Sequence, residues 1–127
     1  DLSRVGGKYP DSWHWIHLRN PREIEPRSNM PPYAFLLAEP LDLSLTQRKL
    51  EVLSDLGHPY DESMIQSAVA DARAQAERVA ASLRKDGQAL DDAEARSEAV
   101  ALIAFLQRLG TDIRWRDASV SAGGAGQ

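Results

Sequence analysis

Three side chains in the first third of this chain have the chemistry to bind a transition metal. Met30 lies among prolines in the run Ser28-Asn29-Met30-Pro31-Pro32-Tyr33, and its thioether is a soft, neutral ligand. His14 and His17 are three residues apart, which places both imidazoles on one face of a helix. A loop methionine can equally fill a gap in a core, and the histidine pair can equally serve packing. No Glu or Asp lies on the histidines' turn, so packing is the favoured role for that pair.

The composition excludes several classes of function. The chain of 127 residues has no cysteine, so it contains no disulfide and no thiolate metal site. It also lacks a phosphate-binding loop, a nucleophile elbow, a metal triad and a paired set of carboxylates, so we expect no catalytic centre. The formal net charge of −4 argues against nucleic acid as a partner. No apolar run is long enough to span a bilayer.

The pattern of residues 1–33 predicts one short helix between two loops. Gly6, Gly7 and Pro10 predict a loop over residues 1–10. Asp11 is the expected N-cap of a helix over 12–19, which ends before Asn20-Pro21 because the residue preceding a proline avoids the α region. Residues 20–33 then form a stiff, extended loop, because they contain four prolines: Pro21, Pro26, Pro31 and Pro32.

The back of the chain is periodic in the manner of helices. Ser44 with Gln47 predicts a capping box, and Gly57 ends the helix that follows. Asp61 is the expected cap of a long helix that reaches about Gly87. The apolar face of the first helix consists of Leu50, Leu53 and Leu56, and the heptad-like seam of the second consists of Ile65, Val69, Ala72, Ala76, Val79 and Leu83.

A last helix and a tail complete the organisation. Asp91 with Glu94 resembles a second capping box, and Gly110 closes a helix whose apolar stripe is Ala99, Leu102, Ile103, Leu106 and Leu109. We therefore predict an all-α domain over 1–112, with 62–98 as a helical elaboration and 113–127 as a flexible tail. The elaboration is either packed on the domain's own helices, which we favour, or a docking arm or homodimer seam.

Three segments together resemble class I cytochrome c domains. Residues 1–9, 13–22 and 28–33 are most similar to the mono-haem cytochrome c subunit of cbb3-type haem-copper oxidases, and 101–110 resembles the C-terminal helix of that fold. The resemblance implies a cytochrome c-like helical domain that lacks its first, haem-attachment helix. It also implies an extra long helix before the C-terminal one.

The resemblance assigns roles to particular residues. It implies that Met30 is the axial ligand of a haem iron in the intact protein, and that His14 and His17 lie near the haem edge without binding the iron. Arginines are the candidate partners of the haem propionates, because a guanidinium pairs well with a carboxylate. These candidates are Arg4, Arg19, Arg22 and Arg27, and the implied haem contacts are Leu2, Val5, Tyr9, Trp13, Leu18, Asn29, Pro31 and Tyr33.

The resemblance also implies electron transfer rather than substrate chemistry. A haem c would take electrons from a donor cytochrome and pass them towards the haem-copper subunit, in a periplasm-facing domain anchored upstream in the bacterial inner membrane. The chain departs from the family because it has no Cys-x-x-Cys-His, so we expect a haem-free fragment that begins after that segment. The alternative is a haem-less structural or assembly module. A missing first helix would uncover the last one, which favours homo-oligomers.

Overall fold

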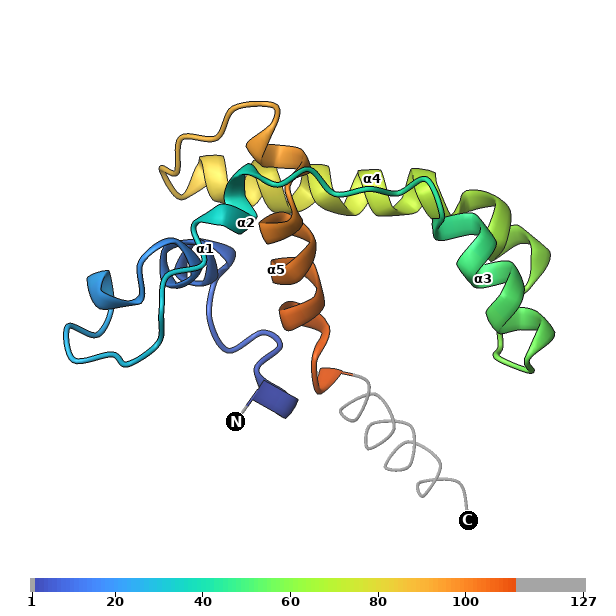
Figure 1. The fold of residues 1–127 in the computed structure, drawn as a ribbon, viewed down its shortest axis with the longest axis horizontal. Coiled ribbons are helices and arrows are strands. Elements are labelled where there is room, and N and C mark those ends of the chain that lie inside the picture. The colour runs from blue at the N-terminus through green and yellow to red at the C-terminus, as the bar shows by residue number, and fades with distance from the viewer. Residues whose placement is uncertain (1, 112–127) are drawn as a thin grey trace, which may run out of the picture.

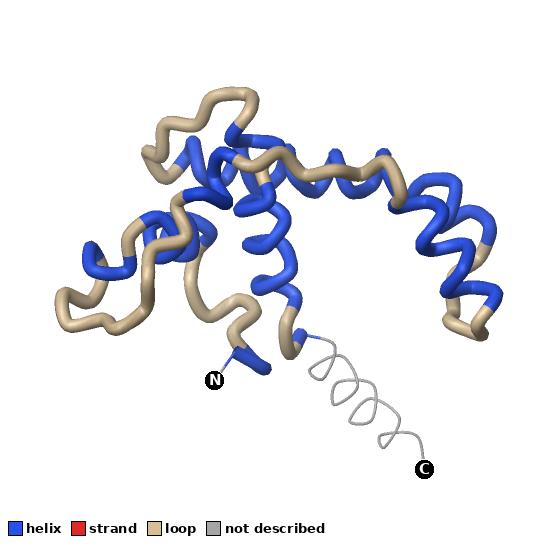
Figure 2. Tube along the Cα trace, viewed as in Figure 1, coloured by secondary structure: helices blue, strands red, loops and turns tan. Residues whose placement is uncertain are grey.

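Helices make up the regular structure of this chain. The computed structural model describes residues 2–111, and within that range it contains α-helices and short 3-10 turns but no strand (Figure 2). The all-α prediction is thereby confirmed. The elements are η1 (Leu2–Arg4), α1 (Asp11–Arg19), η2 (Pro21–Glu23), α2 (Phe35–Ala38), α3 (Thr46–Asp55), α4 (Glu62–Lys85), η3 (Glu94–Arg96) and α5 (Glu98–Arg108).

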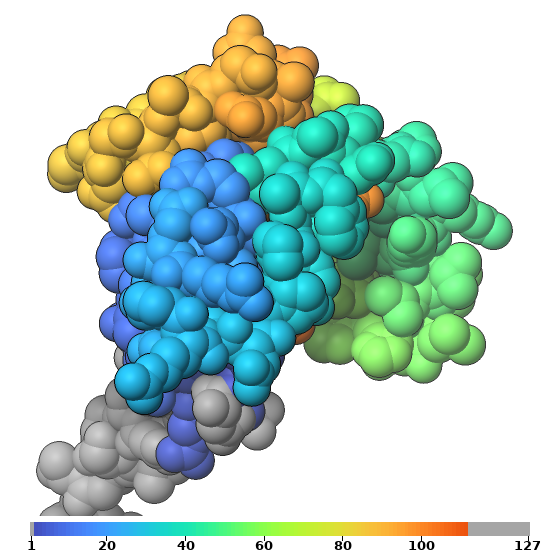
Figure 3. Space-filling view, turned by 60° about the vertical axis from the view of Figure 1, so that its left-hand side comes forward, coloured from blue at the N-terminus to red at the C-terminus, as the bar shows by residue number. Residues whose placement is uncertain are grey.

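The long helix α4 connects two packing regions. Its 24 residues extend about 36 Å at 1.5 Å per residue. The second half of α4 packs with α1 and α5, and α2 packs on α5. We call this group of four helices the body (Figure 1). The first half of α4 packs against α3 and extends away from the body as an arm, which we define as residues 46–75 (Figure 1). From a second direction, α3 lies to one side of the mass formed by the first third of the chain (Figure 3).

The hydrophobic core lies in the body. It brings together side chains from four helices, and the partly buried Met30 and Tyr33 pack against it. Burial of these apolar side chains supplies the main driving force for folding. The core members are Trp15, Leu18, Leu37, Val79, Leu83, Ala99, Val100 and Ile103.

Two of the predicted caps are confirmed. The Asp61 carboxylate accepts a hydrogen bond of 2.8 Å from the amide of Met64 and begins α4. Asp91 and Glu94 form a reciprocal pair, in which each backbone amide donates to the other's carboxylate at 3.1 and 2.7 Å. This pair begins the turn η3 rather than α5, whose N-cap is Ser97.

Two other predicted caps are wrong. Asp11 is the first residue of α1 rather than its cap, because its carboxylate accepts a hydrogen bond from Gln107 and the N-cap position falls to Pro10. Ser44 and Gln47 form no capping box. The amide of Ser44 donates to Asp42 at 2.9 Å, and Gln47 donates to Glu51, so α3 begins only at Thr46.

The predicted seam of α4 is buried at its ends and open in its middle. Ile65 is buried in the arm, and Val79 and Leu83 are buried in the body. The residues between them on the seam are half-buried, because neither region reaches the middle of the helix: Val69, Ala72 and Ala76. Leu56, predicted on the apolar face of the preceding helix, is instead 73% exposed at the end of α3.

Some structure was not predicted, and some predictions fall beyond the described range. The predicted loops over 1–10 and 20–33 contain the turns η1 and η2, respectively, and the four-residue helix α2 follows the Met30 loop. No helix among residues 2–111 combines the length and hydropathy needed to cross a bilayer. The predicted tail over 113–127 lies outside the described residues.

Candidate functional site

A cavity of about 470 Å³ opens in the body between the front of the chain, the Met30 loop and α5. We call it the front cavity. Seven side chains singled out from the sequence line it: Leu2, Val5, Tyr9, Trp13, Leu18, Met30 and Tyr33. The resemblance placed His14 and His17 near the haem edge, and both also line the cavity. Sequence reasoning did not assign the other four to the site, namely Lys8, Leu36, Leu102 and Leu106. Leu102 and Leu106 belong to the apolar stripe of α5, so their inward face was readable from periodicity.

Other candidate residues lie away from this cavity. Asn29 and Pro31 flank Met30 but are exposed and are not part of the lining. Arg19 forms an ion pair of 2.9 Å with Glu23 at the surface. The remaining three arginines are exposed, so the structure brings none of the four to the lining: Arg4, Arg22 and Arg27. Lys8 is the one lysine or arginine among the described residues that line it.

The Met30 loop is held by one hydrogen bond to α1 and by a second within the loop itself. The amide of Tyr33 donates to the carbonyl of Leu18 at 2.7 Å and ties the loop to the end of α1. The amide of Met30 donates to the hydroxyl of Ser28 at 3.2 Å. Prolines 31 and 32 remove two backbone degrees of freedom directly after the methionine. The loop therefore presents the Met30 thioether in a restricted set of conformations.

Gln107 of α5 holds the first residues of the chain in place beside the cavity. Its side-chain amide donates to the carbonyl of Tyr9 at 2.7 Å and to Asp11 at 2.9 Å, and it accepts from the amide of Gly7 at 3.0 Å. A Cβ on Gly6 would collide with the carbonyl oxygens of Gln107 and Leu109. The glycine at this position is thus required for close approach of the two backbones. The sequence signalled a loop here but not this contact.

Stacked rings form one wall of the front cavity. Tyr9 stacks on Trp13 with centroids 4.1 Å apart, and Trp13 stacks on His17 at 4.5 Å. The His14 ring is nearly perpendicular to the Trp13 ring, with the two centroids 5.2 Å apart. Flat, offset rings of this kind are favourable pairs and form a rigid, apolar surface.

His14 is the unusual polar group of this wall. It is 3% exposed, and no hydrogen-bond partner for its Nε2 lies within residues 2–111. Burial lowers the pKa of His14, against the attraction of nearby Asp11, and burial also lowers the pKa of His17. Both imidazoles are therefore neutral at neutral pH. No group of three His, Cys, Asp or Glu side chains within the described range gathers as a metal site.

These features fit a flat, largely apolar group with a polar edge. The volume lies within the roughly 300–1,000 Å³ of small-molecule sites. A methionine thioether is one of the axial ligands of haem iron in cytochromes c, and Met30 lines this cavity. A buried imidazole nitrogen without a partner is expected to bind a polar group of whatever fills the space.

The family comparison agrees with this geometry. Residues 1–113 match the family described as "Cytochrome C oxidase, mono-heme subunit/FixO". No curated protein matches the chain. The match covers most of the 127 residues and includes α1, the Met30 loop, α4 and α5. The chain therefore belongs to the family of mono-haem subunits of cbb3-type cytochrome c oxidase.

Proposed function

We propose that the front cavity is the haem c site of an electron-transfer subunit, and that Met30 is an axial ligand of its iron. One observation carries this proposal. Met30 and six side chains that the resemblance implies as haem contacts line one cavity, although they come from separate segments: Leu2, Val5, Tyr9, Trp13, Leu18 and Tyr33.

Different residues of the cavity would contact different parts of a haem. The Tyr9–Trp13 stack offers a flat wall, and Leu102 and Leu106 of α5 add apolar lining that would help to exclude water. When bound, the haem supplies a one-electron Fe(III)/Fe(II) couple. A neutral thioether favours Fe(II), so ligation by Met30 raises the reduction potential.

We assign the polar edge of the haem to Lys8 and His14. The four candidate arginines do not line the cavity, whereas Lys8 and His14 do, and the His14 Nε2 has no hydrogen-bond partner among the described residues. Hydrogen bonds from these groups to a carboxylate would satisfy the buried imidazole. Leu2 and Tyr9, which are 64% and 43% exposed, lie at the mouth of the cavity. An electron donor would approach there.

The rest of the proposal follows the family. Electrons would pass from a donor cytochrome through this subunit to the haem-copper subunit, in a periplasm-facing domain tied to the inner membrane. Covalent attachment would need a Cys-x-x-Cys-His segment, which these 127 residues do not contain. The alternative function is a haem-less assembly module.

Substitution of Met30 tests the leading proposal. In a protein with a Cys-x-x-Cys-His segment joined upstream, Met30→His should keep a low-spin haem but lower the potential by about 100 mV or more, since surroundings tune haem over ~0.8 V. Met30→Ala should give a high-spin ferric component. Met64→Ala is the control, because Met64 is 46% exposed on the first turn of α4.

Two outcomes would reject the assignment. One is an unchanged spectrum and potential in Met30→Ala together with a shift in Met64→Ala. The other is failure of the extended protein to take up haem, which favours the assembly module. The 127-residue chain itself should show no band on haem-stained denaturing gels, because it has no cysteine for thioether bonds.

We also propose that the isolated chain self-associates. The apolar stripe of α5 is only partly covered, and Phe105 on the same helix is 59% exposed. Exposed apolar patches of this kind favour association between copies. Light scattering of the purified chain should show at least a partial dimer. A strictly monomeric species at high concentration would contradict this.

A further inference from the structure

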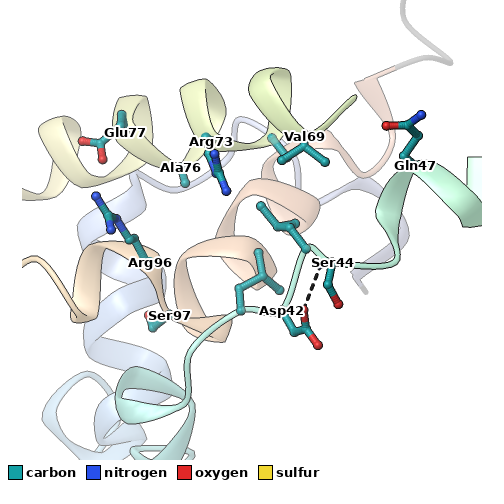
Figure 4. Close-up of a pocket in the computed structure, with 12 residues that line it drawn as sticks. Asp42, Ser44, Gln47, Val69, Arg73, Ala76, Glu77, Arg96 and Ser97 are labelled. Carbon is teal, nitrogen blue, oxygen red and sulfur yellow. Dashed lines mark hydrogen bonds between the residues drawn. The ribbon is translucent and has the colours of Figure 1, made fainter. Parts of the chain in front are cut away.

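A second cavity, of about 730 Å³, lies between α4, the segment 41–44 and the start of α5 (Figure 4). We call it the arm cavity. None of its lining residues also lines the front cavity. The cavity forms because neither the body nor the arm covers the middle of α4. The family assignment gives it no role.

Two guanidinium groups face this cavity without ion pairs. Arg73 points from α4 towards the segment 41–44, and Arg96 points from η3 towards α4 (Figure 4). Neither forms an ion pair within residues 2–111, although the carboxylate of Glu77 also lines the cavity. The Asp42 carboxylate is hydrogen-bonded to Ser44 at 2.9 Å. The lining thus carries two carboxylates and two guanidinium groups, and neither carboxylate forms an ion pair with Arg73 or Arg96 in the described structure.

A buried hydroxyl lies on the same wall. Ser97 is 1% exposed, lines the arm cavity, and its Oγ has no hydrogen-bond partner among the described residues. It occupies the N-cap of the 11-residue helix α5 but makes no side-chain cap bond. A buried hydroxyl without a partner is costly, and a helix N-terminus favours negative charge. Both observations point to an anionic acceptor as the missing partner.

The remaining wall of the arm cavity is apolar. Val69, Ala72 and Ala76 come from the half-buried middle of the α4 seam, and Leu41 and Leu43 face them from the extended segment. Small alanine side chains leave room along the helix. A purely polar anion would leave this surface in contact with water.

We propose that the arm cavity binds an amphiphile with a single carboxylate head and an alkyl chain. The head lies between Arg73 and Arg96 and accepts a hydrogen bond from the Ser97 hydroxyl, as charge-assisted pairs with guanidinium favour. The alkyl chain lies along Val69, Ala72 and Ala76. Binding is independent of haem, since the two cavities share no lining residue.

Calorimetric titration of the 127-residue chain with decanoate tests this proposal. We expect saturable binding of one decanoate per chain. Decyltrimethylammonium and decanol, which keep the tail and change the head, should bind about tenfold or more weakly. Acetate, which keeps the head alone, should also bind about tenfold or more weakly. Absence of decanoate binding, or equal binding of any of the other three probes, would overturn the proposal.

Variants locate the site. The double variant Arg73→Gln with Arg96→Gln should bind decanoate about tenfold or more weakly, because both charges at the head are lost. Ala72→Phe should weaken binding similarly by filling the place of the tail. Arg78→Gln is the matched control, since Arg78 is an exposed arginine of α4 outside the lining, and it should change affinity by less than about twofold. Unchanged affinity in the double variant, in a chain whose circular dichroism is unaltered, would refute the assignment.

Discussion

The two halves of α4 have the same apolar period but different surroundings. In the body, Val79, Ala80 and Leu83 are almost inaccessible because α1 and α5 cover them. In the arm, Ile65 is the one residue of this helix that α3 buries fully. Periodicity identifies which face of a helix turns inward, whereas burial depends on how many elements reach that face. A single seam therefore yields a core at one end and a cavity in its middle.

The two cavities differ in chemistry for the same reason. The front cavity lies where the aromatic residues of α1 and the Met30 loop meet α5, so its walls are rings, leucines and a thioether. The arm cavity lies where the open middle of the α4 seam faces the segment 41–44 and η3, so charged side chains beside the seam also line it. One suits a flat apolar cofactor, and the other suits a charged head with an apolar tail.

Truncation of α4 side chains should reveal this asymmetry most strongly. Leu83→Ala removes a fully buried side chain from the core and should lower the free energy of unfolding by about 2–5 kcal/mol. Val69→Ala removes methyl groups that already face a cavity and should cost less than about 1 kcal/mol. Urea denaturation measures both. Equal losses in the two variants would mean that the arm is as tightly packed as the body.

Acidification should weaken the body through His14. Burial lowers its pKa in the folded protein below the ordinary 6.5, so the unfolded chain binds more protons as the pH falls through that range. The contribution of His14 to the free energy of unfolding is fully present above about pH 7 and declines below about pH 6.5. The slope of this decline is at most about 1.4 kcal/mol per pH unit for each histidine. His14→Gln should flatten the decline measured by urea denaturation between pH 7.5 and 5.

The matched control for this measurement is His58→Gln, which alters an exposed histidine in the loop after α3. A decline that is equally flattened by His58→Gln, or that persists unchanged in His14→Gln, would show that the buried imidazole is not its source.

Local signals in the sequence predicted local structure well. Asp61 and the Asp91–Glu94 pair were recognisable because their partners are three residues away. The Asp11 cap failed because a side chain 96 residues away, Gln107, binds the same carboxylate. The sequence places no such long-range competitor, and it gave no sign of the small helix α2 either.

For the candidate site too, the sequence indicated the local segments but not the long-range contacts that position them. Met30 and the aromatic residues lie in segments whose order resembles the family, and they do converge on one cavity. Lys8 was not assigned to its wall, because the front backbone is folded back by Gln107 and Gly6 rather than by any local signal. No pattern in the sequence predicted the arm cavity, because it arises where neither the body nor the arm covers the middle of α4.

The smallest expected effect compares the N-caps of the two long helices. Asp61 caps α4 with a real hydrogen bond of 2.8 Å, so Asp61→Ala should cost about 1 kcal/mol of unfolding free energy. Ser97 occupies the same position on α5, but its hydroxyl binds no backbone amide and is buried without a partner in the described structure. Ser97→Ala should therefore leave the ligand-free chain unchanged or stabilise it by up to about 1 kcal/mol. Urea denaturation of both variants decides the comparison, and a loss near 1 kcal/mol for Ser97→Ala would show that this hydroxyl is already satisfied.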